Sequence, residues 1–124
     1  MITHIHSATV IVSDQDKALE FYTGTLGWEI EIDQPMGDGK FITVKPKDGQ
    51  ASLALGTSAM FGGASVPTMG ISLIADDVQK TYEELSAKGV KFTMKPEPMP
   101  WGDIGAHFED PDGNSFYLNG PAPS

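Results

Sequence analysis

The sequence contains no cysteine, which excludes disulfides, thiolate zinc sites, iron–sulfur clusters and a cysteine nucleophile. Basic residues are scarce as well, because eight Lys and Arg stand against seventeen Asp and Glu, for a formal net charge of -9. Such a charge repels phosphate backbones and anionic bilayers, so we expect no nucleic acid and no membrane partner. No apolar run reaches the ~18 residues of a membrane span, and the first residues lack a signal-peptide pattern. We therefore expect a cytoplasmic protein.

A length of 124 residues fits one domain with a real hydrophobic core. In the first half, the β-branched run 4–12 predicts a strand. An amphipathic helix should follow, capped by Ser13 or Asp14 and ending at Gly27. Its apolar face comprises Ala18, Phe21, Tyr22 and Leu26. Three more strands are predicted over residues 28–33, 41–45 and 51–55.

The second half repeats this order of elements. A strand is predicted over 70–75, and a helix begins at Asp76 and Asp77 with an apolar face of Val78, Tyr82 and Leu85. Further strands are predicted over 91–94, 104–109 and 115–118. A shift of 63 residues lays Ile11 on Ile74 and Asp14 on Asp77. We thus expect one domain, residues 1–124, built from module one (about 4–55) and module two (about 70–119). The surface loop 56–69 between them is either a connector or a lid over a pocket.

Two strings, VSDQDKALEFYTGTLGW in the first half and FEDPDGNSFYL in the second, together with the repeat, resemble the vicinal oxygen chelate superfamily. This superfamily includes glyoxalases, bleomycin-resistance proteins and extradiol dioxygenases. The resemblance covers nearly the whole chain. It implies an α+β fold in which two βαβββ modules form a curved mixed sheet around a cleft, with the helices outside. It also implies a homodimer, because members of the family cover exposed sheet edges by pairing chains.

The metal positions of that family are empty in this sequence. Metal-using members carry His, Gln or Glu at four places in the cleft, which correspond here to Ser7, Gly70, Tyr117 and a position in the strand 51–55. None of these offers a strong ligand for a divalent ion, which needs about three converging protein ligands. We therefore expect no metal and no cofactor.

The three histidines differ in their predicted surroundings. Strand alternation puts His4 and His6 on the face opposite Ser7, where a structural histidine packed toward the helix layer is expected. In the last hairpin, the apolar pattern pairs Glu109 with Ser115, Phe108 with Phe116 and Ala106 with Leu118. His107 and Tyr117 then share the other face, which the family correspondence assigns to the cleft. His107 either points into the pocket or lies in solvent near the strand end.

The remaining acidic residues are assigned no chemistry. Glu29, Glu31 and Asp33 alternate with apolar residues, which indicates a half-exposed strand with its charges in water. The segment DPDGN, residues 110–114, has turn chemistry and lacks the later Glu of a calcium loop, so a structural hairpin is expected.

A pocket of aromatic and small polar groups remains. Trp101, in MPWGD, either covers a flat ligand or caps the core, and Tyr117 and His107 provide a polar edge. The floor is predicted to comprise Ser7, Thr9, Ser72 and Ser115, and the rim Phe41 or Phe61.

The leading functional hypothesis is a metal-independent small-molecule-binding protein of the bleomycin-resistance kind, with an aromatic or cationic guest. Two rivals stay open. One is a lyase, isomerase or dioxygenase that binds a divalent metal through displaced ligands. The other is a metal-free enzyme with His107 as base and Tyr117 as acid. The sequence has no Ser–His–acid spacing and no glycine-rich phosphate loop, so hydrolytic and nucleotide chemistry lack a candidate.

Overall fold

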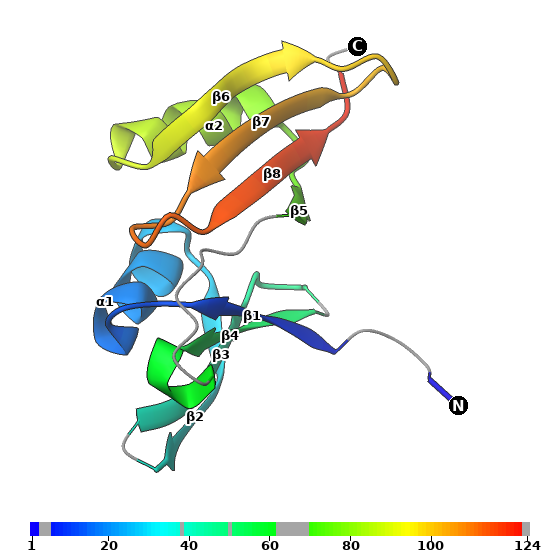
Figure 1. Ribbon diagram of the computed structural model, residues 1–124. Coiled ribbons are helices and arrows are strands. Elements are labelled where there is room, and N and C mark those ends of the chain that lie inside the picture. Colours follow the sequence, from blue (N-terminus) through cyan, green and yellow to red (C-terminus); the bar gives the residue numbers. More distant parts are fainter. Residues whose placement is uncertain (3–5, 38, 50, 62–69, 123–124) are drawn as a thin grey trace. The chain divides into compact units, whose positions relative to one another are not determined.

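The structure, a computed structural model, describes residues 1–2, 6–37, 39–49, 51–61 and 70–122. The chain separates into two compact units, Met1–Pro67 and Thr68–Ser124. Each unit has a four-stranded mixed sheet with helix beside it, in the order strand, helix, three strands (Figure 1). The predicted α+β fold of βαβββ modules is therefore confirmed, and we keep the names module one and module two for the units. Within these ranges no helix is long and apolar enough to cross a bilayer.

Module one builds its sheet in the order β1-β4-β3-β2, with β1 parallel to β4 and the other neighbours antiparallel. Val10 pairs with Leu55 and Val44 with Leu53, so these side chains share one sheet face, where they are buried. The elements are β1 (Ser7–Ile11), α1 (Gln15–Leu19), η1 (Glu20–Thr25), β2 (Glu29–Met36), β3 (Gly39–Lys45), β4 (Ser52–Gly56) and the 3-10 helix η2 (Ser58–Phe61).

The first helix differs from its prediction, because it changes type after one turn and a half. Asp14 is the N-cap, and its Oδ1 accepts from the amides of Asp16 and Lys17. After α1 the chain continues as the π-helix η1. This segment contains Gly24 and two threonines, and both residue types have a low α-helix propensity. The expected apolar residue Tyr22 is still buried, between Phe21 and Trp28.

Module two has the sheet order β5-β8-β7-β6, and Figure 1 shows α2 against one face of it. Asp77 caps α2, as the sequence predicts, through a bond from the Lys80 amide to its side chain. The elements are β5 (Ile71–Ile74), α2 (Val78–Ala87), β6 (Lys91–Pro98), β7 (Ile104–Glu109) and β8 (Ser115–Gly120). Under the helix, a core of Val78, Ala106 and Leu118 is buried, with Leu73, Ala75, Phe92 and Ile104 packed against it.

The internal repeat extends to the strand register. In module one Thr9 pairs with Ala54, and 63 residues later Ser72 pairs with Tyr117. The same offset relates every pair along the two parallel ladders from Ala8 onward. Both modules therefore place equivalent residues on equivalent sheet faces, and each position in one module has a counterpart in the other.

Two strands that contain proline run further than the sequence indicates. β2 was predicted to end at residue 33 and β6 at residue 94, but they continue through Pro35 and through Pro96 and Pro98. Both are edge strands of their sheets. A proline on an edge strand costs no ladder hydrogen bond when its missing N–H would point outward, so the prolines did not mark the strand ends.

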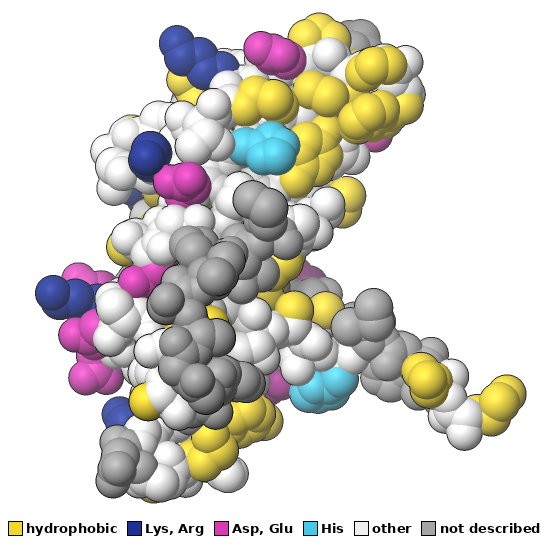
Figure 2. Space-filling model, viewed as in Figure 1, with side chains coloured by type: hydrophobic (Ala, Val, Ile, Leu, Met, Phe, Trp, Pro, Cys, Tyr) yellow, Lys and Arg dark blue, Asp and Glu magenta, His cyan; other side chains and the backbone are white. Residues whose placement is uncertain are grey.

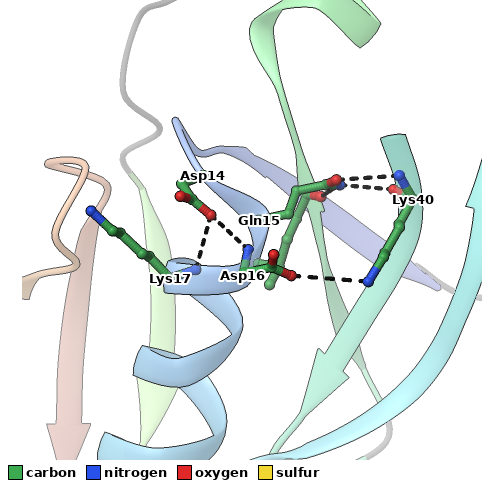
Figure 3. A network of polar contacts seen from close by, with 6 residues as sticks. Asp14, Gln15, Asp16, Lys17 and Lys40 are labelled. Atoms are coloured by element: carbon green, nitrogen blue, oxygen red, sulfur yellow. Dashed lines mark hydrogen bonds and ion pairs between the residues drawn. The ribbon is translucent and has the colours of Figure 1, made fainter. Parts of the chain in front are cut away.

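A side chain of α1 closes the gap where β3 and β4 stop pairing. The β3–β4 ladder includes Thr43–Ala54 and Val44–Leu53. Beyond it, Gln15 Nε2 donates to the carbonyls of Lys40 (2.7 Å) and Leu55 (2.8 Å), and its Oε1 accepts from the Lys40 amide (3.2 Å; Figure 3). The carboxamide thus replaces ladder bonds that the diverging strands no longer make, and it ties α1 to the sheet.

Candidate functional site

The uncovered face of the module two sheet brings His107 and Tyr117 together. The hairpin register pairs His107 with Tyr117, Phe108 with Phe116 and Glu109 with Ser115, as predicted. The two rings lie edge to face, with centroids 4.9 Å apart and an interplanar angle of 65°. Phe108 and Phe116 are buried on the opposite face. The predicted aromatic pair is therefore real and faces away from the α2 core.

Tyr117 leans along the sheet over Gly105. A Cβ on Gly105 would lie 2.2 Å from Tyr117 Oη and 2.8 Å from Cζ, so glycine is what lets the phenol occupy this place. The hydroxyl donates to Asn119 Oδ1 (3.4 Å), and Asn119 Nδ2 donates to Asp103 Oδ2 (3.1 Å). The Tyr117 ring therefore lies across the sheet face and presents an aromatic surface. Its hydroxyl is directed along the strands.

Three neighbours extend this face. Ser72 pairs with Tyr117 from β5, Met94 pairs with His107 from β6, and Ser115 stands two residues before Tyr117 on β8. Figure 2 shows hydrophobic side chains gathered over β6 to β8. We call Ser72, Met94, His107, Ser115 and Tyr117 the aromatic face.

Trp101 lies in the turn before β7 and is 63% exposed. That exposure contradicts the interpretation in which it caps the core. Its contact with a ligand stays a prediction.

The second face of the module one sheet, opposite Val10 and Leu55, carries small and polar side chains. Ser7 pairs with Ser52 and Thr9 with Ala54, opposite the buried face of Val10 and Leu55. The predicted floor residues of module one therefore lie on the same side of their sheet. Of the two predicted rim residues, Phe41 on β3 is 37% exposed, and the side chain of Phe61 is outside the described part of the chain.

Glu31, which the sequence places in water without a role, is engaged on this polar face. It is the extra residue at a β-bulge between Ile30 and Ile32, and it lies on the sheet face of Thr43 and Ser52. Its Oε1 accepts from Ser52 Oγ at 2.8 Å and from Thr43 Oγ1 at 3.2 Å. The Ser52 hydrogen bond is the largest influence that lowers the pKa of the Glu31 carboxyl below its ordinary value. The predicted exposure of Glu31 is confirmed, whereas its hydrogen bonds to residues on two other strands leave no signal in the sequence.

His6 also differs from its prediction. It precedes β1 and is exposed, so it is not a structural histidine packed into the helix layer. Its positive form contributes to lowering the pKa of Glu31, which places it electrostatically near that carboxylate. His4 lies outside the described residues.

No described cluster of side chains has the composition of a metal centre. Among residues 1–2, 6–37, 39–49, 51–61 and 70–122, no three His, Asp or Glu side chains converge. The segment 110–114 is a structural turn, as predicted, because Asp110 accepts from the amides of Asp112 and Asn114 and from the Asn114 side chain. Both Asp110 and Asn114 are buried.

Comparison with known proteins agrees with this architecture. The sequence profile of the Glyoxalase/Bleomycin resistance protein/Dioxygenase superfamily matches residues 4–118. The chain belongs to this superfamily. The resemblance inferred from VSDQDKALEFYTGTLGW and FEDPDGNSFYL is therefore confirmed.

Several superfamily members are similar over nearly the whole chain. A crystal structure from Sphaerobacter thermophilus is 46% identical with a TM-score of 0.90, covering 96% of this chain and 98% of that one. TnmS3, an antibiotic binding protein from Streptomyces sp. CB03234, is 37% identical with a TM-score of 0.85, covering 98% of both chains. The uncharacterized protein YetH of Bacillus subtilis is 36% identical over 95% of this chain and 98% of its own length.

Proposed function

We propose that this superfamily member is a metal-independent small-molecule-binding protein that sequesters its guest, in the manner of a bleomycin-resistance protein. The observation that carries the proposal is the aromatic face, where Tyr117 lies over Gly105 beside His107. That face offers stacking and hydrogen bonding, and His107 is the one strong metal ligand among its five residues, whereas a divalent metal needs about three. The similarity to TnmS3, an antibiotic binding protein, supports a small-molecule guest.

The guest is proposed to be flat and at least partly aromatic. It would stack on Tyr117 and Trp101, accept or donate a hydrogen bond at His107, and contact Ser72 and Ser115 at the edge. Sequestration needs only desolvation and complementary contacts, so no bond of the guest has to break. The net charge of -9 favours a guest that is neutral or cationic over an anion.

A metal-free enzyme is the second candidate, because His107 and Tyr117 are neighbours with ring centroids 4.9 Å apart. In that mechanism His107 removes a proton from the substrate and Tyr117 returns one. The Tyr117 hydroxyl, however, donates its proton to Asn119 within the protein, so this hydrogen bond would have to break before Tyr117 could donate to a guest. To decide, a ligand recovered with the protein is incubated with it and then analysed by mass spectrometry. A chemically unchanged ligand favours sequestration, whereas turnover favours the enzyme.

We further propose a cytoplasmic homodimer. Each sheet has two edge strands within its own module, and Ile74 on the edge strand β5 is 79% exposed. An exposed edge strand with a large apolar side chain is commonly covered by a second copy of the chain.

The test uses the two tryptophans. Trp28 packs against Tyr22 in module one, with centroids 5.5 Å apart, whereas Trp101 is exposed. In a Trp28→Phe variant, an aromatic antibiotic found by thermal-shift screening should still change the fluorescence, which then comes from Trp101 alone. Trp101→Ala should weaken binding several-fold, since a stacked aromatic contributes about 1 kcal/mol beyond its area. Equal binding by the wild type and by Trp101→Ala/Tyr117→Phe would place the pocket elsewhere.

A further inference from the structure

Module one holds a carboxylate in a fixed position on its polar face. The side chain of Glu31 reaches from the edge strand β2 across β3 to β4, where Ser52 Oγ donates to its Oε1 at 2.8 Å. Thr43 Oγ1, on the intervening strand, donates to the same oxygen at 3.2 Å. Two hydroxyls from two strands therefore fix one oxygen of a side chain that would otherwise rotate freely in water.

The hydroxyls that hold Glu31 are themselves rigid. Thr43 is 0% exposed and Ser52 is 4% exposed, while Glu31 is an exposed residue. Glu31 is the extra residue at a β-bulge, and bulges are common beside active sites. Preorganised supports under an exposed group are what a binding site requires, because the guest then does not have to order the group.

The second carboxylate oxygen is available. Both hydrogen bonds of Glu31 end on Oε1, and within the described part of the chain no hydrogen bond or ion pair engages Oε2. His6 and Lys45 lie near enough to influence Glu31, but neither forms an ion pair with it, and Lys45 Nζ instead donates to the carbonyl of Gly49 (3.4 Å). The charge of Glu31 is thus not neutralised by a described neighbour.

We propose that Glu31 is an anchoring site for a protonated amine, whose N–H donates to Oε2 while Ser52 and Thr43 hold Oε1. The proposal rests on the proposed small-molecule-binding function and deepens it by naming a charged group that the guest carries. A charge-assisted hydrogen bond to a fixed carboxylate is stronger than a neutral one and selects for positive charge.

The repeat shows that this anchor belongs to module one alone. The strand registers give the counterparts of these three residues in module two. Glu31, at the bulge of β2, corresponds to Thr93 at the bulge of β6, while Thr43 corresponds to His107 and Ser52 to Ser115. Module two thus carries a neutral bulge residue beside an aromatic pair, and module one carries an acid beside two hydroxyls.

The experiment compares phenethylamine with phenethyl alcohol, which share a ring and differ in the cationic group. Each is titrated into the full chain while amide NMR signals are followed. The matched control is Asp33→Asn, which removes the same charge from β2 two residues from Glu31. Asp33 pairs with Ile42, which belongs to the buried face of the sheet, so its side chain is on the other side of the strand.

In the wild type we expect the amine to shift the amide NMR signals of Thr43 and Ser52. It should bind there about fivefold more tightly than the alcohol, because a partly solvated ion pair contributes a modest free energy. Glu31→Gln, which keeps an oxygen for both hydroxyls, should abolish this preference, and Asp33→Asn should retain it. The preference should also weaken between about 0.02 M and about 0.5 M NaCl.

The result separates the two proposals. Wild-type signals at Thr43 and Ser52 that do not respond to the amine, or that respond equally in Glu31→Gln, overturn the amine anchor. Shifts at Trp101, His107 and Tyr117 report on the aromatic face in the same spectra. If those shifts occur without any at Ser52, the binding function stands and the anchor is wrong. If neither region responds, the anchor is likewise wrong.

Discussion

Replacing Gly105 by alanine should disturb the aromatic face, because the new methyl group occupies the space that Tyr117 fills. The added Cβ would lie 2.2 Å from Tyr117 Oη, 2.8 Å from Cζ and 3.0 Å from Cε1. Carbon atoms do not approach this closely, so the phenol ring must swing away. The movement breaks the hydrogen bond to Asn119 and alters the edge-to-face contact with His107.

The expected change in the free energy of unfolding is the balance of three contributions. Overpacking a well-packed site typically costs about 1–3 kcal/mol, and the lost hydrogen bond adds about 1 kcal/mol. Alanine lowers the entropy of the unfolded chain relative to glycine, which returns about 0.4–1 kcal/mol where φ is not positive, as at Gly105. The net loss in the free energy of unfolding should be about 1–3.5 kcal/mol, and the Tm should fall by about 4 °C for each kcal/mol lost.

The assay is a double-mutant cycle measured by urea denaturation. Gly105→Ala is combined with Tyr117→Ala, which removes the ring and should make the added methyl harmless, so that the two changes are coupled by at least about 1 kcal/mol. Gly24→Ala is the control, because its Cβ meets nothing within 4 Å. Additive effects of the two substitutions, or equal stability of Gly105→Ala and wild type, would refute the seating of Tyr117 on Gly105.

Three further outcomes are expected. Elemental analysis after a short chelator treatment should find no stoichiometric zinc, iron, nickel or manganese, because Ser7, Gly70 and Tyr117 offer no strong ligands, and near one equivalent would contradict this. Light scattering at micromolar concentration should give a molecular mass of about twice 13.3 kDa, and the mass of a single chain would contradict the proposed homodimer. The third concerns pH, since the folded state lowers the pKa of Glu31, chiefly through Ser52. Its carboxylate then adds stability that is fully present above the ordinary Glu pKa of about 4.3 and is lost as the pH falls through the lowered pKa of the folded state. The stability difference between wild type and Glu31→Gln, from denaturation at each pH, should shrink over that range. A constant difference would show that Glu31 titrates alike in both states.

The aromatic face could be predicted from the sequence because a strand has a period of two. Once Phe108 is placed opposite Phe116, every other pair in the hairpin is determined, and His107 must meet Tyr117. The repeat was equally accessible, since the helix caps Asp14 and Asp77 and the following apolar residues keep their spacing. These features depend only on local periodicity and on turn chemistry.

The polar face could not be predicted in the same way. Period-two alternation correctly left Glu31 exposed, but it could not show that the carboxylate reaches Ser52 and Thr43 on two other strands. The function of Gln15 was hidden for a related reason, because its carboxamide serves backbone groups of Lys40 and Leu55 that lie far away in sequence. Such long-range side-chain contacts leave no pattern in a single sequence.

The duplication explains why one fold can present two unlike surfaces. Equivalent positions keep the same register, so a substitution at one of them changes the chemistry of a face without moving the strands. Thr43 of module one corresponds to His107 of module two, and Ala54 corresponds to Tyr117. Module two therefore carries two rings where module one has two small side chains. The second ring needs free space above its diagonal neighbour, which Gly105 supplies, whereas the matching position in module one holds Phe41. A Tyr at position 54 would therefore find no such space, and an aromatic face of this kind is restricted to module two.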